Sequence, residues 1–186
     1  MANYFGPQRF GRRGDNVEQA LDRLNKARLK RQQKSLLLSA LRSHLFNRIL
    51  AQRIRMDLWR RPIDGDVFML RGSRSIFSEP LDAELQRRFD ALDISSTASL
   101  YGAGRNLLGG EALNIERRVN EANPEIVECL DRQQAKMQMR PLRVAVERLE
   151  YELDRSGEVF VLQTRLPAGS YLTSLLGHFV NAGETA

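Results

Sequence analysis

Cysteine, histidine and long apolar runs are scarce in this sequence, and each scarcity excludes a class of structure or site. The single cysteine, Cys129, cannot form an internal disulfide, and His44 and His178 are too far apart to have the spacing of metal ligands. No apolar run reaches the roughly 18 residues that cross a bilayer, and the first residues lack a signal-peptide pattern. The sequence therefore predicts a cytoplasmic protein with no membrane segment and no metal site.

Acidic residues are scarce in the first third of the chain. Residues 1–61 contain 15 Lys and Arg against 4 Asp and Glu, whereas residues 62–186 contain 14 against 19. The first part therefore carries a net charge of +11 and the remainder −5, and arginine far outnumbers lysine. Guanidinium groups bind phosphate oxygens in pairs and stack on bases. The asymmetry favours a nucleic-acid partner, although a solvated basic face would give the same counts.

The strongest candidate for a binding element is the stretch Asn3–Gly11, which contains three aromatic rings, an arginine and two glycines. This composition is expected of a loop that stacks on a flat ligand while touching its phosphate. A buried core strand is the simpler alternative, and the stretch alone does not decide between them.

Apolar residues recur at helical spacing in two stretches that follow. The first predicts a helix over residues 15–31, with basic residues at its carboxyl end, where they favour the helix dipole. The second predicts a long, largely buried helix over residues 35–56. Arginines on this helix, such as Arg42 and Arg53, are expected to cover its flank, although they could pair with acidic residues or reach RNA.

The middle of the chain alternates short strands and helices. Strands are predicted at 67–70, 75–78 and 94–100, and helices at 81–91, 111–120 and 124–134. Two turns there were candidates for chemistry. The Asp64-Gly65-Asp66 turn has no further ligand spaced to complete a metal site, and the glycine-rich loop 101–110 lacks a phosphate-binding spacing. Both are interpreted as ordinary connections.

The end of the chain predicts a hairpin and a helix. Residues 142–153 and 158–166 alternate apolar with polar side chains on either side of a turn. Ser170 is the expected N-cap of the helix that follows. A hairpin this apolar needs further strands beside it.

Four motifs, in order along the chain, resemble the family of D-type tRNA pseudouridine synthases. Asn-Tyr-Phe-Gly-x-Gln-Arg-Phe-Gly stands at Asn3–Gly11, and Arg-Ser-x-Leu-Phe-Asn stands at Arg42–Asn47. Asp-Gly-Asp stands at Asp64–Asp66, and Leu-Pro-Ala-Gly-Ser stands at Leu166–Ser170, followed by Tyr171. The first and last motifs are specific, whereas the middle two alone would be weak.

The resemblance implies an α+β fold, in which a partial pseudouridine synthase catalytic domain, an antiparallel sheet with helices, is interrupted by an inserted α/β domain. The catalytic pieces would be residues 1–29 and 140–186, and the insertion residues 30–139. Family members isomerise a uridine in tRNA without metal or organic cofactor. An aspartate attacks the nucleoside so that the base detaches, turns and rejoins through carbon. tRNA is therefore the implied partner.

The resemblance also implies which residues bind the substrate. Asn3 would hydrogen-bond near the target base or the catalytic aspartate, Phe5 would stack on the extruded uracil, and Tyr171 would line the pocket. Gln8 and Arg9 would support the loop or contact phosphate. The basic residues expected to contact RNA are Arg12, Arg13, Arg28, Lys30 and Arg31.

The family's Gly-x-Lys-Asp motif, which carries the nucleophilic aspartate, is absent from these 186 residues, and no Lys-Asp pair occurs among them. The chain therefore resembles the carboxy-terminal portion of such an enzyme and is expected to be inactive alone. Two alternatives stay open from the residues. One is a non-catalytic RNA-binding module, and the other is a structural remnant that pairs its incomplete sheet edge with another copy.

Overall fold

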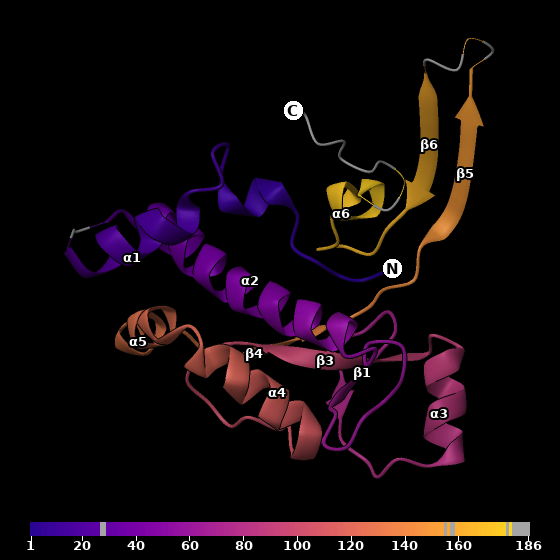
Figure 1. Cartoon of the computed structure of the whole chain (residues 1–186), viewed down its shortest axis with the longest axis horizontal. Coiled ribbons are helices and arrows are strands. Elements are labelled where there is room, and N and C mark those ends of the chain that lie inside the picture. Colours follow the sequence, from indigo (N-terminus) through magenta and orange to yellow (C-terminus); the bar gives the residue numbers. More distant parts are fainter. Residues whose placement is uncertain (27–28, 155, 157–158, 178, 180–186) are drawn as a thin grey trace.

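A computed structural model describes residues 1–26, 29–154, 156, 159–177 and 179 of the chain. Within these ranges the chain forms helices and antiparallel strands, which confirms the expected mixture of α and β elements. The described part contains no helix that combines the length and apolarity needed to span a membrane. Figure 1 shows helix α2 (Arg31–Arg55) running diagonally across the molecule, with a sheet and shorter helices below it and the amino terminus and the terminal hairpin above it.

The helices and strands follow one another in this order. They are the 3₁₀ helix η1 (Pro7–Phe10), α1 (Asn16–Lys26), α2 (Arg31–Arg55), β1 (Phe68–Leu70), β2 (Ile76–Phe77), α3 (Ala83–Asp90), β3 (Ile94–Leu100), α4 (Gly110–Glu121), α5 (Pro124–Arg132), β4 (Gln138–Pro141), β5 (Glu147–Leu153), β6 (Phe160–Arg165) and α6 (Leu172–Leu176).

Helix α2 is the central packing element. Its side chains Leu41, Leu45 and Phe46 are fully buried, and they belong to a core that also takes residues from α1, α4 and α5. Complete burial of one such side chain contributes about 1.5–3 kcal/mol. Cys129 of α5 is buried in the same core, and burial raises the pKa of its thiol. The largest share of the apolar stabilisation therefore surrounds α2.

The larger sheet has the strand order β2-β1-β3-β4, and every neighbouring pair is antiparallel. Strand β3 occupies the predicted range 94–100. Helix α3 covers one end of the sheet, where Phe89 packs with Phe68 and Ile94 in a second, smaller core. Strand β4 was not predicted, because its Gln-Met-Arg-Pro sequence has no period-two apolar pattern. It is specified by pairing with β3, where Arg140 lies opposite Ala98.

The boundary between the first two helices differs from the sequence prediction. Helix α1 ends at Lys26, and α2 begins at Arg31 rather than at Ser35. Residues 31–34, Arg-Gln-Gln-Lys, are good helix formers, so they extend α2 toward its amino end. Lys30 and Arg31 therefore lie at the positive end of a helix dipole, the reverse of the stabilising position that was expected.

The terminal hairpin is shorter than predicted. Strands β5 and β6 pair with each other over 147–153 and 160–165, and a bulge interrupts the register near Arg148, which has a φ of 50°. Residues 142–144 instead run antiparallel to the start of the chain. There the amide of Asn3 donates to the carbonyl of Leu142 at 2.9 Å, and Ala2 is bridged to Arg143. The strand predicted to begin at residue 142 therefore begins at Glu147, because residues 142–144 pair with the first residues of the chain.

Ser170 is not the N-cap of the last helix. The N-cap of α6 is Tyr171, with no side-chain cap, and the Ser170 amide instead donates to the carbonyl of Pro167 at 3.1 Å. The hydrogen bond from the Ser170 amide thus closes the turn of the Leu-Pro-Ala-Gly-Ser motif just before the helix. Ser170 was a reasonable candidate because serine is a preferred cap, but the turn places the cap one residue later.

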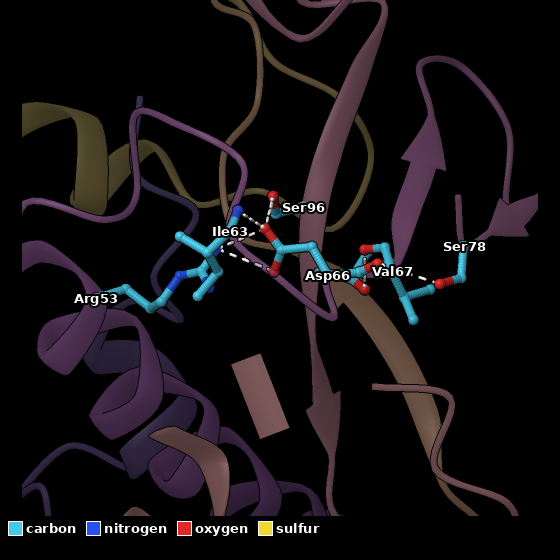
Figure 2. Close-up of polar contacts among 7 residues, drawn as sticks. Arg53, Ile63, Asp66, Val67, Ser78 and Ser96 are labelled. Carbon is cyan, nitrogen blue, oxygen red and sulfur yellow. Dashed lines mark hydrogen bonds and ion pairs between the residues drawn. The ribbon is translucent and has the colours of Figure 1, made fainter. Parts of the chain in front are cut away.

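A buried ion pair joins α2 to the sheet, as Figure 2 shows. Nη2 of Arg53 donates to the two carboxylate oxygens of Asp66 at 3.1 and 3.0 Å, and both side chains are almost completely buried. The same carboxylate accepts from the hydroxyl of Ser96 at 2.6 Å and from the amide of Ile63 at 2.9 Å. Asp66 therefore connects α2, the turn before β1 and strand β3. The alternative that Arg53 pairs with an acidic residue is confirmed.

The Asp-Gly-Asp turn also requires its glycine. Gly65 has a φ of 77°, and a Cβ atom at this position would collide with the backbone of Gly109. The amide of Gly109 donates to the carbonyl of Gly65 at 2.9 Å. The turn thereby fixes the end of the glycine-rich loop where α4 begins, so its interpretation as a structural turn agrees with its contacts.

Candidate functional site

Phe5 lies where three distant segments of the chain meet. Its ring is 8% exposed. The ring of Phe46 contacts it edge-on at 5.6 Å between centroids, and the ring of Tyr171 at 5.7 Å. The guanidinium carbon of Arg140 lies 3.9 Å from the Phe5 ring centroid, so an arginine covers one face of the ring. The stretch 3–11 is a buried loop and a 3₁₀ helix rather than a core strand.

The Arg-Ser-x-Leu-Phe-Asn motif in α2 holds the backbone of Phe5. Oδ1 of Asn47 accepts from the Phe5 amide at 2.9 Å, and Nδ2 of Asn47 donates to the Phe5 carbonyl at 3.0 Å. Arg42, at the other end of the motif, donates to the carbonyls of Leu100, Tyr101 and Lys136. Through Asn47 the motif holds the backbone of Phe5, and through Arg42 it holds the start of the glycine-rich loop.

Replacing Asn47 with alanine is expected to lower the free energy of unfolding by about 2 kcal/mol, because the Phe5 amide and carbonyl would both lose their partner. Urea denaturation followed by circular dichroism would measure the change. Asn114→Ala on α4, where the side chain is exposed, is the matched control and should change the value by less than about 0.5 kcal/mol. Equal effects of the two substitutions would contradict a stabilising role of the hydrogen bonds between Asn47 and Phe5.

The amino-terminal loop is fastened to α6 by side chains. Nε and Nη2 of Arg9 donate to Oη of Tyr171 at 2.9 and 2.5 Å. Thr173 donates to the side chain of Gln8 at 2.8 Å, and Ser174 donates to the carbonyl of Tyr4 at 3.1 Å. The two ends of the described chain therefore close one site, in which the polar tip of Tyr171 is engaged by Arg9.

Asn3 is buried and forms the second polar centre of the site. Its Oδ1 accepts from Nη2 of Arg140 at 2.7 Å, and its Nδ2 donates to the carbonyl of Pro141 at 2.8 Å. The same Arg140 nitrogen donates to the carbonyl of Gly169 at 3.0 Å. Arg140 therefore connects the amino-terminal loop, strand β4 and the Leu-Pro-Ala-Gly-Ser turn.

The site is positively charged. The pKa of Arg140 is lowered to about 10. Burial is the largest cause, Tyr171 partly offsets it, and the nearby charge of Arg9 adds to it. The group is still protonated at neutral pH. The acceptors of Arg140 are neutral oxygens, and in the part of the chain that the structure describes no carboxylate forms an ion pair with either Arg9 or Arg140. Two unpaired cations thus flank the Phe5 ring.

A groove of about 990 Å³ opens beside this cluster. It extends from Asn3 and residues 167–170 to the loop between β1 and β2, and its lining contains four arginines, Arg71, Arg74, Arg140 and Arg143. None of the described residues that line it is acidic. Outside the lining, Glu147 pairs with Arg71 at 2.7 Å, and both of these side chains are about half exposed. The groove therefore has a strongly positive wall.

Arg143 is also held in place by contacts with the protein. Its guanidinium lies over the ring of Phe89, with the carbon 3.3 Å from the centroid, and Nη2 donates to the carbonyls of Phe89 and Ile94. Burial lowers the pKa of Arg143 to about 10. Arg74, by contrast, is exposed to solvent. The groove thus combines a fixed cation with an accessible one.

The structure brings together most, but not all, of the predicted site residues. Asn3, Phe5, Arg9 and Tyr171 form one cluster, and Gln8 joins it through Thr173. The other predicted basic residues that are described, Arg12, Arg13, Lys30 and Arg31, are exposed and do not line the groove. Arg28 lies outside the described residues.

Arg140 and the other groove arginines were not predicted from the sequence. No local pattern marks them, because each acquires its neighbours from strand pairing and packing. Arg140, for example, takes its position from the pairing of β4 with β3. Among the described residues, no group of three or more His, Cys, Asp or Glu is placed to hold a metal ion.

Comparisons with known proteins show the family of the chain. The family model described as tRNA pseudouridine synthase D (TruD) matches residues 12–179. A protein named tRNA pseudouridine synthase D from Methylococcus capsulatus is 40% identical over 97% of this chain and 51% of its own length. One of the same name from Aeromonas salmonicida is 41% identical over 99% of this chain and 52% of its own length.

The fold is also found among solved structures. A crystal structure from Methanosarcina mazei, described under the name tRNA pseudouridine synthase D (TruD), has a TM-score of 0.66 and 19% identity, and it aligns with 97% of this chain and 61% of its own. The chain spans about half the length of the curated relatives that it matches. Because the family model matches most of the chain and both relatives exceed 30% identity, the chain belongs to the tRNA pseudouridine synthase D (TruD) family.

Proposed function

We propose that this chain is the part of a tRNA pseudouridine synthase that binds the target base and the surrounding RNA. The observation that carries the proposal is the arginine-lined groove that opens beside the buried Phe5 cluster. RNA phosphates would provide the negative charge that this wall lacks, since arginine binds phosphate oxygens in pairs. The curated relatives support the choice of substrate because they are named for tRNA.

The proposed organisation has two parts. Residues 1–29 and 140–186 would be pieces of the catalytic domain, and residues 30–139 the inserted domain. Contacts between residues 1–29 and 140–186 support their assignment to one domain, since Ala2 is bridged to Arg143 and Ser174 donates to Tyr4. The inserted part would contribute α2 as the support of Phe5 and the β1–β2 loop as the far wall of the groove.

Phe5 would stack on the uracil that leaves the RNA helix. Arg140 covers one face of that ring, so a base stacked there would take the place of its guanidinium. The displaced Arg140 could then bind a phosphate at the mouth of the groove, where its charge has no carboxylate partner in the described chain. Asn3 would offer its amide to the base once Arg140 has moved.

The RNA flanking the target base would follow the groove. Arg71, Arg74 and Arg143 would contact its phosphates. The exposed residues Arg12, Arg13, Lys30 and Arg31, together with Arg28, would contribute contacts outside the groove. Gln8, Arg9 and Tyr171 would keep the amino-terminal loop in place, because their hydrogen bonds join it to α6 and to Ser39.

Replacing Arg71 and Arg74 together with alanine is expected to weaken tRNA binding roughly tenfold or more, since one charge-assisted hydrogen bond contributes about 1.5–3 kcal/mol. The slope of log affinity against log salt should also become shallower by about two, one for each lost phosphate contact. Fluorescence anisotropy with labelled tRNA between about 50 and 200 mM salt would measure both quantities.

Arg117→Ala with Arg118→Ala is the matched control, because these two arginines are exposed on α4 and do not line the groove. It removes the same charge from the chain. We expect it to change affinity and slope much less than the groove pair. A wild-type affinity independent of salt, or equal losses in the two double variants, would rule out the groove as the RNA contact.

The chain alone is expected to leave tRNA uridine unchanged, because no Gly-x-Lys-Asp motif is present to supply the nucleophile. Isomerisation releases the hydrogen at C5 of uridine, so tRNA tritiated at that carbon reports the reaction. No release above background is expected from the purified 186-residue chain. Release that is abolished by Phe5→Ala would contradict this expectation and would place a nucleophile elsewhere in the sequence.

A further inference from the structure

A second cavity, of about 420 Å³, lies between α2 and the segment that joins η1 to α1. Figure 1 shows η1 and α1 beside α2, and both contact it. Helix α2 contributes residues three and four positions apart, which share one face of a helix. The lining of this α1–α2 pocket is Phe10, Gly14, Val17 and Glu18 on one side and His44, Asn47 and Arg48 on the other. None of these residues lines the arginine groove.

The α1–α2 pocket contains two opposite charges that have no ion-pair partner. Glu18 and Arg48 are both exposed, and in the part of the chain that the structure describes neither forms an ion pair. Burial lowers the pKa of His44, the charge of Arg48 lowers it further, and a hydrogen bond with Asn123 partly offsets both. The imidazole is therefore mainly neutral at pH 7 and does not neutralise the Glu18 carboxylate.

Two of the basic residues that do not line the groove stand next to this pocket. Arg12 and Arg13 directly precede Gly14, in a turn where the Gly14 amide donates to the carbonyl of Gly11 at 3.1 Å, and both arginines are exposed. Together with Arg48, three arginines are in or beside the pocket against one carboxylate. A matching ligand would carry negative charge for the arginines and N–H donors for the carboxylate.

A guanine nucleotide combines these groups. The N1–H and the exocyclic amine of guanine are neighbouring donors, and they can pair with the two oxygens of a carboxylate such as Glu18. Its O6 and N7 accept from arginine, and its phosphate can bind the arginines beside the pocket. Adenine, cytosine and uracil do not present two neighbouring donors on this edge. The partly buried ring of Phe10 offers an apolar surface on which a base can stack.

We propose that the α1–α2 pocket binds a guanine of the RNA close to the target base, with Glu18 accepting from its Watson–Crick edge. The proposal rests on the RNA binding proposed above. Asn47 supports the placement, because it lines the pocket and also holds the backbone of Phe5. Phe5 and Phe10 are five residues apart in the chain, so their backbones lie within about 18 Å, which a few nucleotides can bridge.

The pocket would give the protein a means of reading sequence. Contacts of the groove arginines with phosphates position an RNA but do not distinguish its bases. A carboxylate paired with two donors of guanine does distinguish them, because the other bases would leave an oxygen of Glu18 without a partner or facing an acceptor. The pocket thereby selects where along the RNA the Phe5 site is placed.

Titration with 5′-GMP tests the pocket without the groove. The chain has two histidines, so the imidazole signals of His44 in a proton NMR spectrum are identified by their loss in His44→Gln. We expect GMP to shift these signals with an affinity about fivefold or more above that of AMP or UMP. Glu18→Gln should abolish the preference. Glu121→Gln, an exposed residue of α4 outside both cavities, should retain it.

A short uridine-rich RNA with one guanine tests the same contact in RNA. Its partner carries inosine, which lacks only the exocyclic amine, and fluorescence anisotropy measures both affinities. Inosine should weaken binding by about fivefold or more with the wild-type chain and should have no effect with Glu18→Gln. Arg71→Ala with Arg74→Ala should weaken both RNAs equally and leave their ratio unchanged. Circular dichroism would show that each variant is folded.

The outcomes separate this proposal from the proposed function. Equal affinities for the guanine and inosine RNAs, with the salt dependence of binding intact, would overturn the guanine pocket alone. Selective binding of GMP without a difference between the two RNAs would identify a free nucleotide as the ligand and would also overturn it. Absence of all RNA binding by the wild-type chain would contradict the proposed function itself, and an RNA guanine as the ligand with it.

Discussion

Replacing Arg53 with methionine is expected to lower the free energy of unfolding by about 3–5 kcal/mol, a large part of the total stability of a single domain. The carboxylate of Asp66 would remain buried, with Ser96 and the Ile63 amide as its donors but without a neutralising charge. The cost comes from this orphaned charge rather than from the strength of the pair itself, since desolvation of both groups already opposes their attraction.

A double substitution separates these two contributions. Arg53→Met with Asp66→Asn removes both charges and keeps an acceptor for Ser96 and the Ile63 amide, so it should recover much of the loss. Lys26→Met, which breaks the exposed pair with Asp22, is the control and should cost less than about 0.5 kcal/mol. Urea titration measures all three variants. A loss below about 1 kcal/mol in Arg53→Met would show that the Asp66 carboxylate is not left buried without compensation.

Replacing Phe46 with alanine is the second large change, with an expected loss of about 3–5 kcal/mol in the free energy of unfolding. Phe46 is fully buried, and its ring supports both the edge of Phe5 and the guanidinium of Arg140, which lies 5.4 Å from its centroid. The substitution leaves a cavity beneath Phe5. If Phe5 stacks on a base, tRNA affinity should fall roughly fivefold or more as well, because one stacked base contributes about 1–3 kcal/mol.

Phe68→Ala distinguishes the two effects. Phe68 is also fully buried, but it belongs to the smaller core around α3. Its loss should lower stability by a similar amount and leave tRNA affinity nearly unchanged, provided that both variants are assayed where circular dichroism shows them folded. Equal affinities for the two variants would mean that Phe5 does not need Phe46 to bind RNA.

The parts of the fold that the sequence predicts well are those with a local periodic signal. Strand β3 is a short run bounded by Ile94 and Leu100, and its predicted range agrees with the structure. The long apolar arc of α2 predicted its burial. Errors occurred where the local signal was weak. Arg-Gln-Gln-Lys could either end one helix or begin the next, and the structure assigns it to α2.

The candidate site shows a sharper division. The residues around Phe5 that belong to recognisable motifs, such as Asn3 and Tyr171, could be named from the sequence. Arg140 could not, because its position over Phe5 depends on the pairing of β4 with β3 and on contacts with Asn3, 137 residues earlier in the chain. The placement of a long arginine follows from the acceptors and rings that surround it, and these are fixed only after the chain has folded.

The hydrogen bonds that close the site join residues at opposite ends of the chain, and this determines when the site can form. Arg9 reaches Tyr171 across 162 residues, and Ser174 reaches Tyr4 across 170. Bringing such distant segments together costs loop-closure entropy before any contact compensates for it. During synthesis, Tyr4 and Arg9 leave the ribosome long before Tyr171 and Ser174, so these hydrogen bonds cannot form until α6 has emerged. The core around α2 is therefore expected to form early, and the base-binding loop to close last.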